Sequence, residues 1–421
     1  MIGMLLADRH VLVDDPADAD VILINSCCFI GDAKEESIQT ILELAAYKET
    51  GRCKALVLTG CLAERYRDEI PKELPEVDAL LGTNSYDEIC HVIDEALQGA
   101  HPRICKPLTG FPEVHAKRVN TTGGYYAYLK IAEGCDKCCT YCVIPSVRGT
   151  YRSVPIEKLL QEAKQLVSDG AKELILVAQE TTLYGIDLYG KRTLPKLLDE
   201  LNQIPELQWI RLMYCYPEEI TDELVAAIKR NDKVCHYLDM PIQHVSDRIL
   251  KCMGRRTTRK DLRERIAMLR REIPDICLRT TLICGFPGET EENHQELLAF
   301  VRDMRFERLG AFCYSEEEGT KAAEMPGQIK EDEKKRRQSE IMALSEELIF
   351  AENEKRIGEI LTVLVEGKLP EENVYVARTY RDAPEIDGYL FFPYEGELIS
   401  GEQKKVTVTG TNEYDLIGEV L

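Results

Sequence analysis

Short apolar segments alternate with longer amphipathic segments along most of this 421-residue chain. Strands that alternate with helices pair in parallel, because each crossover returns the chain to the same end of the sheet. The alternation is interrupted once, by residues 106–124, whose Pro, Gly and Thr content predicts a linker. The sequence therefore predicts an α/β protein with one parallel sheet on each side of this linker.

The first block, residues 1–105, predicts a parallel βα domain. Its expected strands are residues 20–27, 54–61 and 77–83, and its expected helices are residues 34–49 and 85–97. Cys27 and Cys61 each end one of these strands. Because ligands gather at the carboxyl ends of parallel strands, we expect the two thiols to meet at that edge.

The second block, residues 125–335, predicts a partial (β/α)6 barrel, since six βα units are too few to close an eight-fold one. The expected strands are residues 125–135, 173–180, 209–215, 235–242, 276–285 and 308–315, and the expected helices are residues 155–169, 218–230, 258–271 and 290–304. Chemistry in such barrels lies where strands end. Gln179, Thr181 and Gln243 lie at strand ends and are candidates to line a cofactor or substrate pocket.

The glycine-rich stretch "GFPGET" (285–290) follows the fifth of these strands. Gly285 and Glu289 are candidates to contact a cofactor, with Gly285 allowing close approach of the backbone. A tight turn before a helix, with Glu289 near the helix N-terminus, explains the same letters. Both interpretations stay open at this point.

The last part of the chain changes character twice. Residues 331–356 predict one charged connecting helix, and the charges of residues 331–338 predict a solvated face. Residues 357–421 contain short strands separated by turns, which predicts a small β-barrel.

The chain contains 16 cysteines, four of which lie within residues 135–142. No apolar run reaches the roughly 18 residues that a membrane helix needs, and the N-terminus does not resemble a signal peptide. We therefore expect a cytoplasmic protein, where clustered cysteines more often bind metal or act in catalysis than form disulfides.

The segment "EGCDKCCTYC" (133–142) holds four cysteines. Cys135, Cys139 and Cys142 form a CxxxCxxC loop, in which three thiolates can bind three irons of a 4Fe-4S cube and leave the fourth open. A zinc site would usually have a second CxxC pair or histidines at wider separation. Cys138 forms CxxC with Cys135, but Cys142 then follows four residues later, so we predict that Cys138 is not a ligand.

This loop, directly after the first strand of a partial barrel, resembles the radical S-adenosylmethionine superfamily. The surrounding "KIAEGCDKCCTYCVIPSVRGTYRS", with "NSC" (25–27) and "TGCLAERY" (59–66), resembles the methylthiotransferases of that superfamily. The resemblance implies a transferase in which Cys135, Cys139 and Cys142 ligate a 4Fe-4S cluster that binds and cleaves S-adenosyl-L-methionine.

The same resemblance implies a second, auxiliary 4Fe-4S cluster held by three cysteines of the first domain. Cys27 and Cys61 match the second and third of these ligands. By the family's spacing the first would precede Met1, so we expect that the chain is truncated at its start or begins too late. The auxiliary cluster is then expected to be incomplete. Cys28 is not expected to substitute, because neighbouring residues on a strand point to opposite faces.

Further segments, among them "MPIQHVSDRILKCMGRR", "RLGAFCYSEEEGTKAAEM" and "ARTYRDAPEIDGYLFF", resemble the RimO branch of this family. This implies methylthiolation of the β-carbon of an aspartate in the twelfth small-subunit ribosomal protein, with an electron donor such as a flavodoxin or ferredoxin. Residues 357–421 then resemble a TRAM domain.

Charge bears on the choice of partner. The chain has a formal net charge of −21, and residues 357–421 carry 13 acidic and 5 basic residues. An acidic surface repels phosphates and attracts a basic ribosomal protein, which makes tRNA an unexpected substrate. The alternatives are a tRNA adenosine methylthiotransferase and a non-catalytic iron–sulfur electron-transfer protein. Cleavage of S-adenosylmethionine by the reduced protein would exclude the latter.

Overall fold

The computed structural model describes residues 1–370 and 372–421. The chain divides into two compact units, each assembled from segments that are distant in sequence. The first unit consists of residues 1–119, 133–152 and 315–324, and the second of residues 120–132, 153–314 and 325–421. The two-residue strands β6 (Ala132–Glu133) and β7 (Arg152–Ser153) lie where the chain passes from one unit to the other. The cysteine loop therefore belongs to the first unit.

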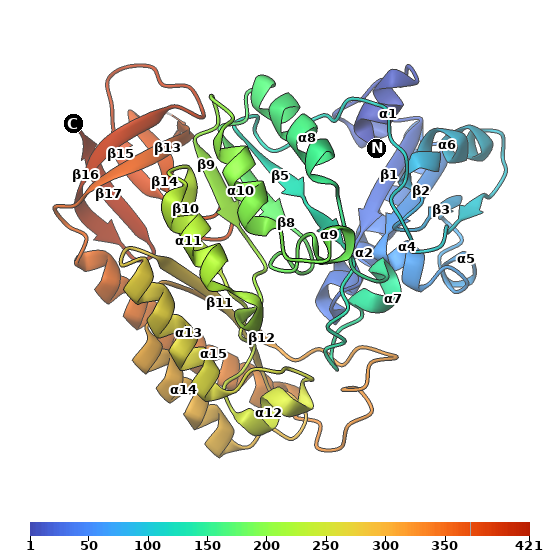
Figure 1. Ribbon diagram of the computed structural model, residues 1–421. Helices are drawn as coiled ribbons and strands as arrows, with labels where there is room; N and C mark the ends of the chain where they lie inside the picture. Colours follow the sequence, from blue (N-terminus) through green and yellow to red (C-terminus); the bar gives the residue numbers. More distant parts are fainter. Residues whose placement is uncertain (371) are drawn as a thin grey trace. The chain divides into compact units, whose positions relative to one another are not determined.

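A four-stranded parallel sheet forms the centre of the first unit, in the order β1-β2-β3-β4; Figure 1 labels β1, β2 and β3. Its strands are β1 (Val21–Ser26), β2 (Ala55–Gly60), β3 (Ala79–Leu81) and β4 (Arg103–Ile104). Its helices are α1 (Ile2–Ala7), α2 (Gly31–Ala45), α3 (Tyr47–Thr50), α4 (Cys61–Arg65), α5 (Ile70–Glu73), α6 (Ile89–Leu97) and α7 (Ile144–Arg148). Parallel sheets need apolar residues on both faces, and every residue of β2 is buried.

Alternate residues of these strands build two cores, one on each face of the sheet. Ala55 and Val57 pack with residues of α1 and α6. Leu56 and Leu58 pack in the other core, to which α2 and α4 contribute. Val143 and Val147 lie in that second core as well, so the segment that follows the cysteine loop is anchored on the first sheet.

A six-stranded parallel sheet in the order β12-β11-β10-β9-β8-β5 forms the centre of the second unit. Its strands are β5 (Tyr126–Lys130), β8 (Glu173–Val177), β9 (Trp209–Leu212), β10 (Val234–Asp239), β11 (Cys277–Cys284) and β12 (Arg308–Cys313). The helices between them are α8 (Ile156–Ser168), α9 (Ile186–Tyr189), α10 (Leu194–Asn202), α11 (Asp222–Arg230), α12 (Asp247–Cys252), α13 (Arg259–Glu272) and α14 (Glu291–Met304). The expectation of an α/β fold with a six-stranded parallel sheet is confirmed.

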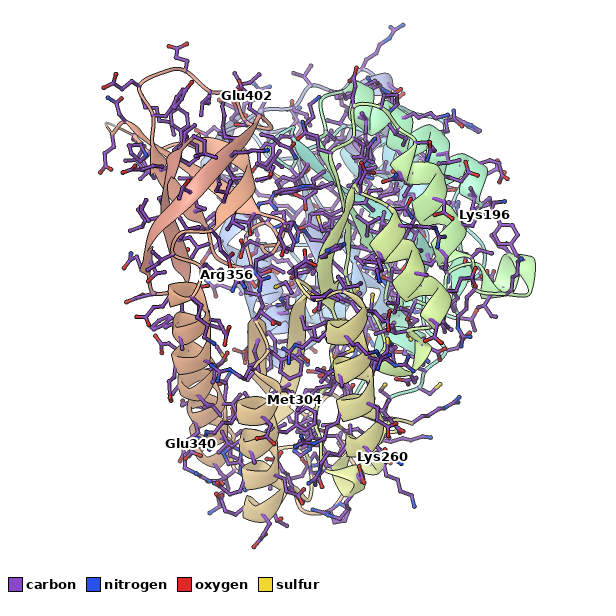
Figure 2. All side chains as sticks on the ribbon, turned by 60° about the vertical axis from the view of Figure 1, so that its left-hand side comes forward. Lys196, Lys260, Met304, Glu340, Arg356 and Glu402 are labelled. Carbon is purple, nitrogen blue, oxygen red and sulfur yellow. The ribbon has the colours of Figure 1, made fainter. Side chains whose placement is uncertain are left out.

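Capping residues fix where two of these helices begin. The Thr258 side chain accepts from Asp261 N and starts α13, and Thr290 does the same with Asn293 N at α14. Both are capping boxes, which satisfy backbone donors that a helix start leaves open. Ion pairs and hydrogen bonds then join the helices laterally, as between Arg263 and Asp303. Figure 2 labels Lys260, Met304 and Glu340 on the neighbouring helices α13, α14 and α15 (Glu331–Glu354).

The expectation of a solvated face at residues 331–338 holds for Glu331, Asp332, Lys335 and Arg336, which are exposed, but is wrong for Lys334 and Arg337. Lys334 and Arg337, one turn apart on α15, are buried. Lys334 Nζ donates to the Tyr314 carbonyl oxygen at 2.8 Å, and Arg337 Nη1 donates to Glu289 at 3.0 Å. Charge in the sequence predicted exposure, but a buried partner within the second unit satisfies each of these two cations.

The C-terminal residues form a closed five-stranded barrel in the order β13-β14-β15-β17-β16, as expected. Its strands are β13 (Ile360–Lys368), β14 (Val374–Thr379), β15 (Leu390–Pro393), β16 (Gln403–Asn412) and β17 (Asp415–Val420). No helix in residues 1–370 and 372–421 is long and apolar enough to cross a membrane.

A buried ionic network joins this barrel to the six-stranded sheet within the second unit. Glu173, at the start of β8, accepts from Arg211 Nε at 2.6 Å and from Arg378 Nη2 of the barrel at 2.7 Å. All three side chains are fully buried. Burial would raise the pKa of Glu173, but the two guanidinium groups outweigh it and hold this pKa below its usual range. A second buried pair joins Arg308 to Asp382.

We predict that Arg378→Ala lowers the free energy of unfolding by about 3–5 kcal/mol, because it removes one partner from a buried ion pair. Lys355→Ala, which breaks the exposed pair with Glu352, should change it by less than about 1 kcal/mol. The Glu173 contribution is present above the unfolded-state pKa and is lost as the pH falls through the lowered folded-state pKa. Urea denaturation at neutral and acidic pH should therefore show that the free energies of unfolding of the unchanged protein and of Arg378→Ala approach each other in acid. An equal loss of unfolding free energy in Arg378→Ala at both pH values would contradict this account.

Candidate metal centre

Cys27 and Cys61 lie at the same edge of the first sheet. Ser26 and Gly60 are register partners on β1 and β2, and each cysteine follows one of them. Gly60 has a φ of +96°, and a Cβ there would lie 2.4 Å from the Ser26 carbonyl oxygen, so only glycine allows this close approach. The two strand ends are thus held together directly beneath the two cysteines.

The environments of the thiols at this edge differ. Cys27 is exposed, whereas Cys28 and Cys61 are buried. Burial raises the pKa of the Cys28 thiol to about 11, with Cys61 adding to the rise, and Cys28 lies within the apolar core. Burial also raises the pKa of Cys61, against which Arg148 acts. Adjacent residues of one strand end thus face solvent and core respectively.

The four cysteines of the loop also differ in burial. Cys135 and Cys139 are buried and Cys142 is half-buried, while Cys138 is exposed and has a φ of +51°. The Cys142 amide donates to the Cys139 carbonyl oxygen at 3.1 Å, and the Ile144 amide donates to Cys142 Sγ at 3.4 Å. An N–H group directed at a sulfur stabilises a thiolate ligand.

The candidate ligands of the loop are all cysteine sulfurs, the donor type that binds iron–sulfur clusters. Within the described residues, no three Cys, His, Asp or Glu side chains are arranged around a single metal ion. In a 4Fe-4S cube each thiolate binds a different iron, so its ligands need not converge on one point. Burial raises the pKa of the Cys142 thiol to about 12, and Cys139, Cys135 and Cys138 add to the rise, so all four thiols of the loop lie near one another. A sulfur-only donor set of closely spaced thiols fits an iron–sulfur cluster.

Two candidates of the second unit carry buried polar atoms with no hydrogen-bond partner in the part of the chain that the structure describes. They are Thr181 Oγ1, after β8, and Gln243 Oε1, after β10. Gln243 has a φ of +68°, and its amide donates to the Thr281 carbonyl oxygen at 2.9 Å. Unsatisfied polar atoms and strained backbone concentrate at ligand sites. Gln179 is half-buried at the end of the same strand region as Thr181.

Gly285 and Glu289 have structural roles in the turn that follows β11. Glu289 is buried, and its Oε2 accepts from the Gly285 amide at 2.7 Å and the Phe286 amide at 3.1 Å. Gly285 has a φ of +72°, and a Cβ there would lie 2.4 Å from Lys334 Cγ. The loop therefore closes on itself and on α15, and a role of either residue toward a cofactor stays a prediction.

The sequence did not single out Arg148 or Glu317, both in the first unit. Arg148 Nη2 donates to Cys61 Sγ at 3.1 Å. Glu317 is buried and accepts from Arg65 Nη1 at 2.7 Å. Arg148 stands in "VIPSVRG", six residues after Cys142, but its direction toward Cys61 depends on tertiary packing. Glu317 is one of three successive glutamates, and nothing in the sequence distinguishes it from the others.

Comparison with known proteins matches three segments of the chain to family models. Residues 129–301 match the radical SAM superfamily, residues 357–421 match the TRAM domain, and residues 1–82 match the uncharacterized protein family UPF0004. The structure of the radical S-adenosylmethionine methyltransferase TsrM from Kitasatospora setae, with cobalamin and a [4Fe-4S] cluster bound, is similar in fold. It has a TM-score of 0.52 at 15% identity, covering 70% of this chain and 64% of that one.

Two relatives are similar over their whole length. Ribosomal protein uS12 methylthiotransferase RimO of Lachnoclostridium phytofermentans is 57% identical, covering 99% of this chain and 95% of the relative. The protein of the same name from Geobacter sulfurreducens is 48% identical, covering 100% and 94% respectively. Sheet, cysteine loop and C-terminal barrel together define the class of radical SAM transferases with a TRAM domain. Within it, the chain belongs to the RimO family of methylthiotransferases.

We predict that Glu317→Ala destabilises the first unit by about 3–5 kcal/mol, because the largely buried Arg65 guanidinium loses its carboxylate. Glu316→Ala is the matched control: its side chain is exposed one residue earlier, and its loss should cost no more than about 0.5 kcal/mol. Urea denaturation measures both variants. Equal stability of the two would show that the Arg65–Glu317 pair contributes nothing.

Proposed function

We propose that this chain methylthiolates ribosomal protein uS12, replacing a hydrogen on the β-carbon of an aspartate by a CH3S group. The observation that carries the proposal is 57% identity to a RimO protein over 99% of the chain, which includes every cysteine assigned a role. The parallel sheets, the cysteine loop and the TRAM barrel support it.

Cys135, Cys139 and Cys142 would hold one 4Fe-4S cluster, and Cys27 and Cys61 would be ligands of the auxiliary one. A cluster held by Cys135, Cys139 and Cys142 would supply one-electron radical chemistry with S-adenosyl-L-methionine, which can act on unactivated carbon atoms. A flavodoxin or ferredoxin is proposed as the electron donor. The chain's own part is to hold the thiols, with Cys135 and Cys139 buried and Cys142 half-buried, and so to limit the access of water to them.

Gln179, Thr181 and Gln243 are proposed to bind polar groups of the cofactor or substrate, with Gly285 and Glu289 shaping the neighbouring turn. The buried, unpartnered Thr181 Oγ1 and Gln243 Oε1 support this role. A polar atom buried without a partner costs roughly 1–3 kcal/mol, and a ligand that supplies the missing hydrogen bond recovers part of that cost. Binding at these two atoms is therefore favoured over leaving them empty.

The TRAM segment is proposed to recruit a basic protein. Two of its five basic residues, Arg378 and Arg381, are buried, as is the acidic Asp382. The exposed carboxylates include those of Glu359, Glu372, Glu385, Glu395, Glu397, Glu413 and Glu419. Such a surface attracts a basic ribosomal protein and repels the phosphates of tRNA.

The experiment uses the full chain, reconstituted and reduced without oxygen, with S-adenosylmethionine, sulfide and either uS12 or unmodified tRNA. We expect 5′-deoxyadenosine to form and one aspartate of uS12 to gain a methylthio group in place of hydrogen, located by peptide mass spectrometry. Modification of tRNA instead would favour the alternative substrate. Absence of 5′-deoxyadenosine would favour a non-catalytic iron–sulfur protein.

We predict that Cys138→Ser keeps the iron content and the cleavage of S-adenosylmethionine, whereas Cys139→Ser loses most of both. Cys138 is exposed with a positive φ, and Cys139 is buried beside Cys142. Iron analysis and the visible absorption of the reconstituted proteins test this difference. If both variants lose iron alike, the assignment of the three ligands is wrong.

A further inference from the structure

Arg148 connects the two groups of cysteines in the first unit. It is the last residue of α7, which begins two residues after Cys142, and its Nη2 donates to Cys61 Sγ at 3.1 Å. A five-residue helix is about 7 Å long. One short helix therefore leads from the cysteine loop to the thiol at the edge of the first sheet.

The backbone around Arg148 is fixed on the side of the core. Val147 is 1% exposed and lies in the same apolar cluster as Leu62, the residue after Cys61. Thr83 Oγ1 donates to the Val147 carbonyl oxygen at 2.7 Å, and Arg152 Nη1 donates to the Arg148 carbonyl oxygen at 2.8 Å. These contacts hold the helix end in place, so the guanidinium is directed at the sulfur by packing.

The charge that Arg148 brings is permanent. Guanidinium stays protonated throughout the range in which proteins are folded. Glu133 Oε1 lies 3.7 Å from Nη1, while Nη2 is the nitrogen bonded to Cys61. The carboxylate therefore balances one side of the guanidinium, and the other side donates to sulfur. An uncharged thiol is a weak acceptor, so this arrangement suits a thiolate far better.

We propose that Arg148 is a positioning residue for Cys61 as a ligand of the auxiliary cluster, and that its N–H group raises the reduction potential of that cluster. This inference rests on the auxiliary site of the proposed function. Hydrogen bonds to cluster sulfurs stabilise the more negative, reduced form. The residue that ends the radical-cluster segment thereby sets the electron affinity of the auxiliary site.

The test isolates the auxiliary site in the full chain by replacing Cys135, Cys139 and Cys142 with alanine. In this background we compare Arg148→Gln, Arg148→Lys and the control Arg67→Gln, an arginine of the same unit whose side chain is mostly exposed. Each protein is reconstituted with iron and sulfide, and its cluster is titrated with reductant while the electron paramagnetic resonance signal is followed.

We expect Arg148→Gln to lower the ratio of reduced to oxidised cluster about tenfold at the parent midpoint, which corresponds to about 59 mV for one electron. Arg148→Lys should recover part of the shift, and Arg67→Gln should show none. A purely structural role would lower the iron content while the remaining cluster kept its potential, and that result overturns the inference. If Cys61→Ser keeps the parent spectrum, or the parent binds no cluster, the auxiliary site itself fails and the inference fails with it.

Discussion

The burial of α7 in the core of the first sheet is the interaction on which the candidate metal centre depends. Val143 and Val147, which follow the cysteine loop, pack in the same core as Leu56, Leu58 and Leu62. Full burial of a side chain of this kind contributes roughly 1.5–3 kcal/mol. This packing brings all five candidate ligands into one compact unit, although more than 100 residues separate Cys27 from the last of them. The loop needs no rigid secondary structure of its own, because the helix that follows it is anchored.

The second unit is held by a different kind of interaction. Its barrel meets the six-stranded sheet through buried charges: Arg378 and Arg211 pair with Glu173, and Arg308 pairs with Asp382. Apolar residues of similar size could stabilise such a junction equally well, so these pairs are weak evidence for stability. These pairs fix how the barrel packs on the sheet, because any other packing would leave a carboxylate buried without its guanidinium partner. The position of the TRAM barrel on the sheet is thereby strongly specified.

The sequence predicted the elements and the edges at which chemistry gathers, because strand and helix periodicity are local properties. It placed Cys27 and Cys61 at strand ends, where the register of Ser26 with Gly60 holds them side by side. It failed for Lys334 and Arg337, since charge alone does not reveal a partner that the fold supplies from elsewhere in the chain. The contact of Arg148 with Cys61 could not be predicted for the same reason. The positive φ of Gln243 was also hidden, because a non-glycine residue gives no local sign of it.

The whole chain is negatively charged, whereas positively charged side chains lie next to the cysteines of the first sheet. The chain carries a net charge of −21, which would by itself make anionic cluster thiolates harder to hold. Around the cysteines of the first sheet, however, arginines supply the donors: Arg148 to Cys61 Sγ, and Arg65 to the Cys28 carbonyl oxygen. Interactions between exposed charges are screened over about 8–10 Å at physiological salt, whereas a direct contact at a buried sulfur is screened far less. A net negative charge of the whole chain can therefore coexist with local positive charge at the candidate metal centre.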